Sequence, residues 1–166
     1  MDPLIRKILV PTDFSEFAER GTTYAAALAR RLGASLHFVH VIEADALAHG
    51  PIDTHADEAN TPGARLYAEV RAQLLAEVDR LNGTRRPLSI STKVRGGAPA
   101  KAITDAAVDY GAAVVVMATH GRTGASHLLM GSVAEQVIRT SRCPVLVVHE
   151  CGQAHVHRPG PTEQVA

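Results

Sequence analysis

The sequence contains no tryptophan, two cysteines and no excess of either charge. Aromatic residues make up 4% of its 166 residues, and 17 Lys and Arg residues balance 17 Asp and Glu residues. This balance argues against a nucleic-acid binder, which would carry a strongly basic face. No apolar run approaches the roughly 20 residues that span a bilayer, and the first residues have no signal-peptide pattern. We therefore expect neither a nucleic-acid nor a membrane partner.

The two cysteines, Cys143 and Cys151, are too few for a disulfide scaffold. If residues 144–149 form a strand, these side chains lie too far apart to be bridged within one chain, because a strand rises about 3.3 Å per residue. The sequence predicts a reduced, soluble, cytoplasmic protein with one domain over residues 1–150. Residues 151–166 have no core pattern and are expected to be a disordered tail.

Five short β-rich runs alternate with helical stretches along the chain. The runs cover residues 7–11, 35–42, 88–94, 113–117 and 144–148. Helices are expected between them at residues 15–32, 64–82, 99–110 and 132–141. This alternation predicts a single doubly wound α/β domain, with a five-stranded parallel sheet and helices on both faces.

Two strand orders suit such a sheet, 2-1-3-4-5 and 3-2-1-4-5. We favour 3-2-1-4-5, because the third run alternates apolar and polar residues, as a peripheral strand does. In this order the winding reverses between strands 1 and 4, and open α/β sheets bind ligands outside the carboxyl ends of the strands at that point. The order therefore predicts a site in the loops after Pro11 and Met117.

The loop after the fourth strand is suited to an anion. Gly121 and Gly124 permit close backbone approach. The helix expected to begin at Gly131–Ser132 offers free N–H groups and the positive end of its dipole. His120 and Arg122 add donors. The location of the whole set favours a phosphate site, although its spacing matches neither the Walker A loop nor the dinucleotide fingerprint.

Both loops also allow a purely structural interpretation. Ser132 and Glu135 fit a capping box, worth about 1 kcal/mol, and Asp13 or Ser15 fits the N-cap of the first helix. In the functional interpretation, Asp13 lies beside a ribose hydroxyl or a phosphate-bound metal. One carboxylate is too few for a dedicated metal site, so a metal at Asp13 would be held through the phosphates of a nucleotide.

Six segments carry a family resemblance. They are Val10–Ser15, His40–Val41, Gly97–Pro99 with Ile103, Val116–Gly124, Gly131–Glu135 and Cys143–Val148. In this order they resemble the universal stress protein family over nearly all of residues 5–149. The resemblance implies a five-stranded doubly wound domain that is usually a homodimer. It also implies, for the ATP-binding branch, the motif Gly-x2-Gly-x9-Gly-Ser/Thr.

Gly121 matches the second glycine of this motif and Gly131–Ser132 its end, whereas Ala118 replaces the first glycine. The methyl group of Ala118 could crowd a ribose or phosphate. The resemblance implies that ATP or a related adenine nucleotide binds, with Mg or Mn as the accompanying metal. It implies that the adenine and ribose are lined by Pro11, Thr12, Asp13 and Val41, and the ribose and phosphates by Met117, Ala118, His120, Gly121, Arg122, Gly131, Ser132 and Val133.

The run at residues 144–148 would be an edge strand in the favoured order, and it carries no charge. An exposed apolar edge is an aggregation hazard unless covered. The same strand of a second subunit would cover it by antiparallel pairing about a two-fold axis, and the C-terminal tail is the alternative cover. The resemblance favours the homodimer. Residues 43–62 are polar and lack a clear period, which leaves a lid, a binding loop or a mobile segment open.

Nine histidines raise the question of a metal site. His37 and His40 alternate with apolar residues and are interpreted as packed or boundary side chains. A C-terminal group has no paired cysteine spacing typical of zinc and is interpreted as solvated tail. It consists of His149, Cys151, His155 and His157. No catalytic set or nucleophile elbow is present, so at most slow ATP hydrolysis is expected.

The sequence thus predicts a stress-response protein that binds an adenine nucleotide as a homodimeric regulatory module. Bound nucleotide would order residues 118–132 and change the surface offered to a protein partner. One alternative is a member of the same family that binds no nucleotide and acts as a dimeric interaction protein. The other is a weak ATPase or phosphotransferase that uses Asp13 and a divalent metal.

Overall fold

The computed structural model describes residues 5–43, 62–83, 87–119 and 130–149. Their helices and strands follow one another as β1 (Lys7–Pro11), α1 (Glu16–Leu32), β2 (Ser35–Ile42), α3 (Pro62–Asn82), β3 (Ile90–Gly96), α4 (Pro99–Tyr110), β4 (Val114–Ala118), α5 (Ser132–Thr140) and β5 (Val145–Val148). The strands form one five-stranded sheet in the order β3-β2-β1-β4-β5. Every neighbouring pair is parallel. The favoured fold and strand order are therefore confirmed.

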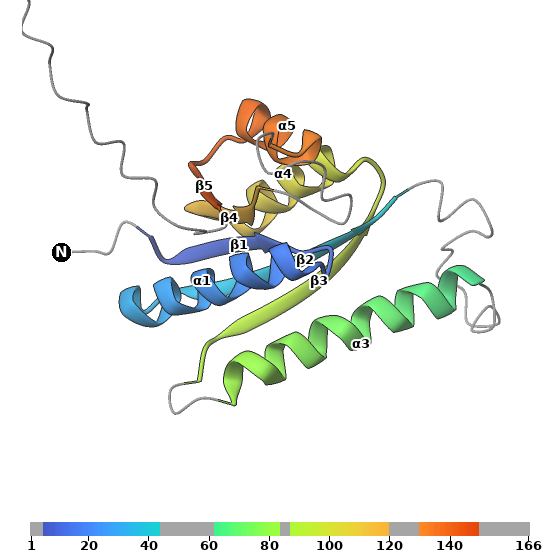
Figure 1. Ribbon diagram of the computed structural model, residues 1–166, viewed down its shortest axis with the longest axis horizontal. Coiled ribbons are helices and arrows are strands. Elements are labelled where there is room, and N and C mark those ends of the chain that lie inside the picture. The colour runs from blue at the N-terminus through green and yellow to red at the C-terminus, as the bar shows by residue number, and fades with distance from the viewer. Residues whose placement is uncertain (1–4, 44–61, 84–86, 120–129, 150–166) are drawn as a thin grey trace, which may run out of the picture.

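Helices cover both faces of the sheet. Figure 1 shows α1 and α3 on one face and α4 and α5 on the other. The α1–α3 face buries a cluster that includes Ile8, Val10 and Val116, and the α4–α5 face buries a second cluster that includes Leu9, Val115 and Met117. Successive side chains of β1 and β4 thus serve opposite layers, as a central strand requires.

The third strand lies two residues later than the sequence predicts. It spans Ile90–Gly96 rather than 88–94 because it pairs along the whole of β2, from Leu36 opposite Ile90 to Ile42 opposite Gly96. Leu88 precedes the strand, and its backbone N–H donates to the side chain of Asn82 at the end of α3 (2.8 Å). The alternating exposure of β3 confirms its peripheral position.

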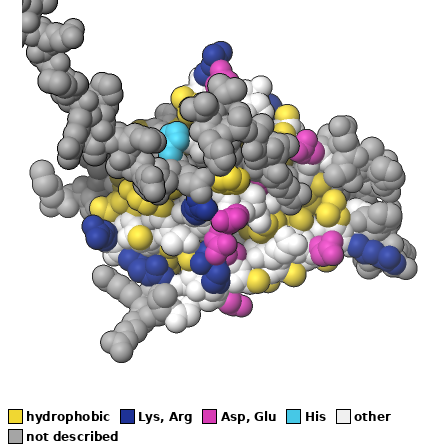
Figure 2. Space-filling view, in the orientation of Figure 1, with side chains coloured by type: hydrophobic (Ala, Val, Ile, Leu, Met, Phe, Trp, Pro, Cys, Tyr) yellow, Lys and Arg dark blue, Asp and Glu magenta, His cyan; other side chains and the backbone are white. Residues whose placement is uncertain are grey.

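A polar network joins α1 to α3. The Thr22 hydroxyl donates to Glu77 Oε1 (2.5 Å), and Arg80 donates to both carboxylate oxygens of Glu77 (2.7 and 2.8 Å). Burial alone would raise the pKa of Glu77, but the hydrogen bonds from Arg80 and Thr22 outweigh it and lower that pKa. Figure 2 shows acidic and basic side chains side by side over this region. The network makes the attachment of α3 sensitive to the charge of one carboxyl group.

In the part of the chain that the structure describes, no helix has both the length and the apolar character needed to cross a membrane.

Candidate functional site

The winding of the sheet reverses between β1 and β4. The chain leaves β1 toward β2 and β3 and returns to pair β4 on the opposite side of β1. Leu9 pairs with Val115, so Pro11 and Met117, each two residues further on, reach the same level of the sheet. The loops after β1 and β4 therefore start beside each other, at the place where this class of sheet binds ligands.

The loop after β1 is held by its own polar groups. The backbone N–H of Thr12 donates to the Val39 carbonyl (2.9 Å), and Thr12 is buried. Asp13 Oδ1 accepts from both the N–H (3.0 Å) and the hydroxyl (2.6 Å) of Ser15. Ser15 Oγ in turn accepts from the N–H of Ala18 and caps α1. Ser15 is thus the predicted N-cap, and Asp13 is oriented by the same turn.

His40, on β2, contacts this loop at Thr12 and Phe14. It is buried, its Nδ1 lies 2.8 Å from the Thr12 carbonyl oxygen, and its ring stacks on Phe14 with centroids 4.7 Å apart. The packed role predicted for His40 is confirmed, but sequence analysis missed which loop it supports. The signal available was a polar residue within an apolar strand end (Val39, His40, Val41) next to the predicted site.

The end of β4 is joined directly to the start of α5. The backbone N–H of Gly131 donates to the Thr119 carbonyl (2.8 Å), and Thr119 is buried. The N–H of Thr119 donates to the Val148 carbonyl (3.3 Å), which ties the same residue to β5. The start of α5 therefore lies against the carboxyl end of β4.

The capping box predicted at Ser132 and Glu135 is wrong. The N-cap of α5 is Gly131, whose carbonyl accepts from the N–H of Glu135 (3.0 Å), and Ser132 is the first helical residue. The Glu135 carboxylate pairs with Arg139 (2.9 Å) rather than turning back to the helix start. Since Gly131 has no side chain, the first-turn N–H groups lack the N-cap bond that the box would supply. Such groups favour an anion.

Three of the apolar residues predicted to line a ligand share one face of the sheet. Met117 is buried in the cluster under α4 and α5, and Val41 and Val133 pack against the same cluster. They come from β2, β4 and α5, whose ends border the reversal point. This arrangement provides the apolar side of a small-molecule site, with the polar groups of the two loops beside it.

The methyl group of Ala118 points away from that face. A Cβ atom built on Gly21 of α1 would lie 3.9 Å from the Ala118 Cβ and 3.3 Å from its backbone nitrogen. Ala118 therefore faces α1, as Val114 and Val116 do on the same strand. Met117, between them, faces α4 and α5. The methyl group by which Ala118 departs from the motif therefore lies in the α1 layer, on the opposite face of the sheet from α5.

Several predicted residues lie outside the described part of the chain. They are His120, Gly121, Arg122 and, in the segment following β2, residues 44–61. The predicted tail at residues 151–166 also lies outside it, so the domain boundary at residue 150 stays a prediction. Within residues 5–43, 62–83, 87–119 and 130–149, no group of three His, Cys, Asp or Glu residues could hold a metal ion.

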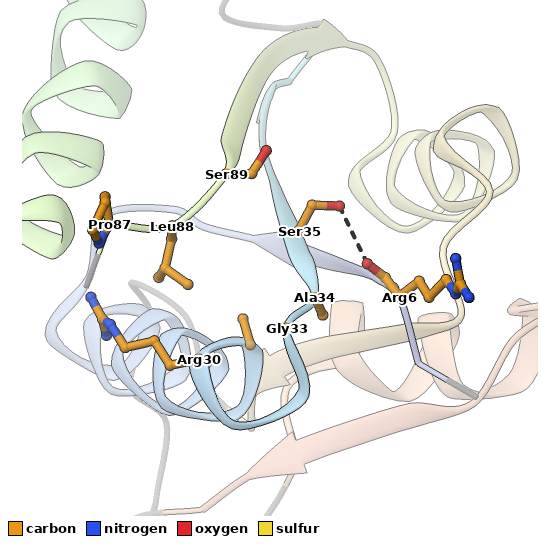
Figure 3. Close-up of a pocket in the computed structure, with 9 residues that line it drawn as sticks. Arg6, Arg30, Gly33, Ala34, Ser35, Pro87, Leu88 and Ser89 are labelled. Carbon is orange, nitrogen blue, oxygen red and sulfur yellow. Dashed lines mark hydrogen bonds between the residues drawn. The ribbon is translucent and has the colours of Figure 1, made fainter. Parts of the chain in front are cut away.

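A hollow of about 330 Å³ lies at the other end of the sheet. Figure 3 shows Arg6 and Arg30 extending to opposite sides of it. Arg30 donates to the Leu81 carbonyl at the end of α3 (2.6 Å), and the Ser35 hydroxyl donates to the Arg6 carbonyl (3.3 Å). These groups connect the elements around the amino ends of β1, β2 and β3. The hollow is therefore at the opposite end of the strands from the loops predicted to bind a ligand.

Comparison with known proteins decides the family. The model of the universal stress protein family matches residues 4–149. The chain belongs to the universal stress protein family. Two curated relatives from Methanocaldococcus jannaschii are each 30% identical to it: universal stress protein MJ0531, over 87% of this chain and 82% of the relative, and universal stress protein MJ0577, over 89% and 97%.

Solved structures show the same fold. That of MJ0577 aligns with a TM-score of 0.74 and 29% identity, over 90% of this chain and 99% of the other. A universal stress protein solved in complex with cAMP aligns at 0.63 and 26%, over 88% and 98%. One from Archaeoglobus fulgidus solved in complex with dAMP aligns at 0.59 and 26%, over 87% and 98%. Some structural neighbours therefore bind adenine nucleotides.

Proposed function

We propose that this protein binds ATP or a related adenine nucleotide at the carboxyl ends of β1 and β4 and acts as a homodimeric stress-response module. The observation that carries the proposal is the junction of Thr119 with Gly131, which holds a helix start without an N-cap side chain at the reversal point of the sheet. Neighbours of the same fold that are solved with cAMP and dAMP support an adenine nucleotide as the ligand.

Each part of the ligand has a chemically suitable counterpart. Val41 and Met117 offer apolar contacts to the flat base, and Asp13, fixed through Ser15, offers a carboxylate to the ribose hydroxyls. The start of α5 offers N–H groups to the phosphates. In the proposed complex, Pro11 and Thr12 border the base, Gly131, Ser132 and Val133 border the phosphates, and His120, Gly121 and Arg122 complete the phosphate end.

Asp13 also fits a divalent metal that arrives with the nucleotide. A carboxylate is a hard oxygen ligand, and Mg²⁺ in nucleotide sites is held by one or two carboxylates together with the substrate phosphates. When bound, the ion would neutralise phosphate charge. The contribution of this chain would be the orientation of Asp13 by the two hydrogen bonds from Ser15.

Ala118 is compatible with this proposal. Its methyl group packs toward Gly21 in the α1 layer, whereas the proposed phosphate end lies at the start of α5 in the opposite layer. The departure from the motif at this position therefore adds no atom to the proposed binding space.

The proposal is tested by placing one negative charge at two positions of the same helix. Ser132→Glu adds it at the proposed phosphate end, and Gln136→Glu adds it one turn later; both side chains are exposed. Two like charges about 4 Å apart repel by roughly 1 kcal/mol in water and more in a drier site, so Ser132→Glu should weaken ATP binding at least about fivefold. Gln136→Glu should bind within about twofold of the unmodified protein.

The measurement is isothermal titration with ATP, AMP and cAMP, with and without Mg²⁺. Acid extraction of the purified protein, followed by anion-exchange chromatography, identifies any nucleotide that co-purifies. If none of the three nucleotides gives heat and no nucleotide is extracted, the nucleotide site is rejected. The alternative function, a dimeric interaction protein that binds no nucleotide, would then stand. Equal weakening by the two substitutions would place the phosphate elsewhere.

The homodimer is proposed through β5. Among the described strands, β5 pairs with β4 alone, and Leu146 on it is exposed. Antiparallel pairing of β5 with its copy would satisfy this edge. Leu146→Lys should convert the dimer to a monomer in light scattering coupled to gel filtration. The matched control is Val108→Lys on α4, where an exposed apolar residue is also replaced by lysine. A wild-type protein that is monomeric at all concentrations would reject the dimer.

A further inference from the structure

The contacts of His40 define its protonated ring nitrogen. Nδ1 lies 2.8 Å from the carbonyl oxygen of Thr12. A carbonyl oxygen only accepts hydrogen bonds, so Nδ1 carries the hydrogen. The imidazole is buried at the carboxyl end of β2, and its ring also stacks on Phe14, with the two planes 19° apart. His40 therefore binds the β1 loop through both a donor and a ring face.

The loop that His40 contacts has an unusual backbone. Phe14 has a φ of 62°, and it is the one residue other than glycine with a positive φ in the described part of the chain. Bulky residues rarely adopt this region without support from their surroundings. The local support comes from Thr12 Oγ1, which accepts from the Phe14 N–H (3.1 Å), and from the His40 ring under the Phe14 side chain.

This backbone sets the direction of Asp13. Asp13 lies between Thr12, whose carbonyl accepts from His40, and Phe14, whose ring stacks on His40. One imidazole thus fixes the residues on both sides of the carboxylate that the proposed function places at the ribose. If the loop left this conformation, the apparent affinity would fall in proportion to the fraction of molecules with the loop in place.

We propose that His40 is a positioning residue that holds the Thr12–Asp13–Phe14 loop in its ligand-competent conformation, mainly through its Nδ1–H. The consequence for binding rests on the proposed nucleotide site, but the effect on the loop does not. His40 acts through the loop rather than by touching the nucleotide.

His37 provides a matched control on the same strand. Its Nδ1 lies 2.8 Å from Ser91 Oγ, and its ring stacks on Tyr110 with centroids 4.5 Å apart and planes 19° apart. Like His40, it has a hydrogen bond at Nδ1 and a ring stack, but its hydrogen-bond partner is a side-chain hydroxyl rather than a backbone carbonyl. Because His37 lies toward the amino end of β2, replacing it should leave the β1 loop unchanged.

Three substitutions separate the donor from the ring. His40→Ala removes both, His40→Phe keeps a ring without the donor, and His40→Asn keeps an N–H donor near the position of Nδ1 without the ring. Loss of the donor leaves the buried Thr12 carbonyl without this bond, which is typically worth about tenfold in an equilibrium. We therefore expect His40→Ala and His40→Phe to behave alike and His40→Asn to approach the unmodified protein.

The first measurement is hydrogen exchange at the amides of Phe14 and Ser15, which donate to Thr12 Oγ1 and Asp13 Oδ1. In the nucleotide-free protein, exchange at these amides should accelerate about tenfold in His40→Ala and His40→Phe. It should stay within about threefold in His40→Asn and within about twofold in His37→Ala. The Val115 amide, which lies on the buried strand β4 and donates to the Pro144 carbonyl, reports global stability and should change little.

The second measurement is the affinity for ATP, which should weaken about tenfold in the same two variants and be rescued by His40→Asn.

Exchange at Phe14 and Ser15 that is unchanged in His40→Ala, or accelerated equally in His37→Ala, would overturn the proposal. If His40→Phe binds ATP as tightly as the unmodified protein, the proposed role of the Nδ1–H donor is overturned. If exchange responds as expected but the unmodified protein binds no nucleotide, the loop effect stands, whereas the nucleotide function and the role of His40 in binding fail. If exchange rises at Val115 as well, His40→Asn decides, because rescue at Phe14 and Ser15 requires the donor.

Discussion

Removing the carboxylate of Glu77 is a direct test of how α3 is attached to the domain. Thr22 is 1% exposed and donates to Glu77. Without that acceptor, the buried hydroxyl keeps the Glu19 carbonyl as its partner (2.9 Å), so only one hydrogen bond is lost, which costs about 1 kcal/mol. The pair with Arg80 adds up to about 1 kcal/mol, because the Arg80 side chain is 40% exposed. Glu77→Ala should therefore lower the free energy of unfolding by about 1–2 kcal/mol, and Tm by roughly 2–8 °C for a chain of this size.

The assay is urea unfolding followed by circular dichroism at neutral pH, with Asp105→Ala as control. Asp105 pairs with Lys101 on α4, and both side chains are well exposed, so its removal should change stability by less than about 0.5 kcal/mol. Equal losses in the two variants would refute the argument, because the predicted difference comes from the part-buried bonds of Glu77 with Thr22 and Arg80.

The same carboxyl group has a defined pH dependence. Burial would raise the pKa of Glu77 in the folded protein, but the hydrogen bonds from Arg80 and Thr22 exceed this effect and hold the pKa below its usual value of 4.5. The stability it provides is complete above the unfolded-state pKa and is lost as pH falls through the lower, folded-state pKa. The stability difference between the unmodified protein and Glu77→Gln should therefore shrink as pH is lowered from 7 through 4.5 and below. A difference that stays constant over this range would contradict the assignment.

Two further predictions concern the contact between α1 and β4. Ala118→Gly should leave the affinity for ATP within about twofold in calorimetry, because the methyl group faces Gly21; a gain of tenfold or more would mean that the methyl enters the binding space. In Gly21→Ala, the new Cβ would lie 3.3 Å from the backbone nitrogen of Ala118, and this crowding costs about 1–3 kcal/mol. Replacing a glycine inside α1 returns about 1 kcal/mol, so the free energy of unfolding in urea titrations should fall by up to about 2 kcal/mol, and a raised midpoint would show that α1 can shift to make room.

The strand order was predictable because one strand differs from the others in pattern. The run at residues 88–94 alternates in polarity, whereas residues 114–118 are apolar throughout, and only an edge or half-covered strand tolerates alternation. Once β3 is placed at an edge, right-handed crossovers fix the reversal between β1 and β4. The loops of the candidate site follow from that topology before any motif is considered.

Local hydrogen bonding was less predictable than topology. Ser132 and Glu135 have the spacing of a capping box, yet α5 begins one residue earlier than the box requires. Glycine is also an acceptable N-cap residue, and the bond from Gly131 to Thr119 fixes the chain at this point. That bond joins residues on either side of the loop after β4, so no short sequence window contains the information that decides between the two N-caps.

The direction of Ala118 shows a different limit. Strand alternation places residues 114, 116 and 118 on one face and residues 115 and 117 on the other. Because β4 is apolar throughout and buried on both faces, its sequence does not reveal which face lies under α5. The answer comes from Gly21, nearly a hundred residues earlier, whose missing side chain leaves room in the α1 layer beside the Ala118 backbone and methyl. The effect of a departure from the family motif can therefore be judged only when the residue packed against it in the fold is known. Here that residue is Gly21, and the Ala118 methyl group packs toward it, away from the proposed ligand.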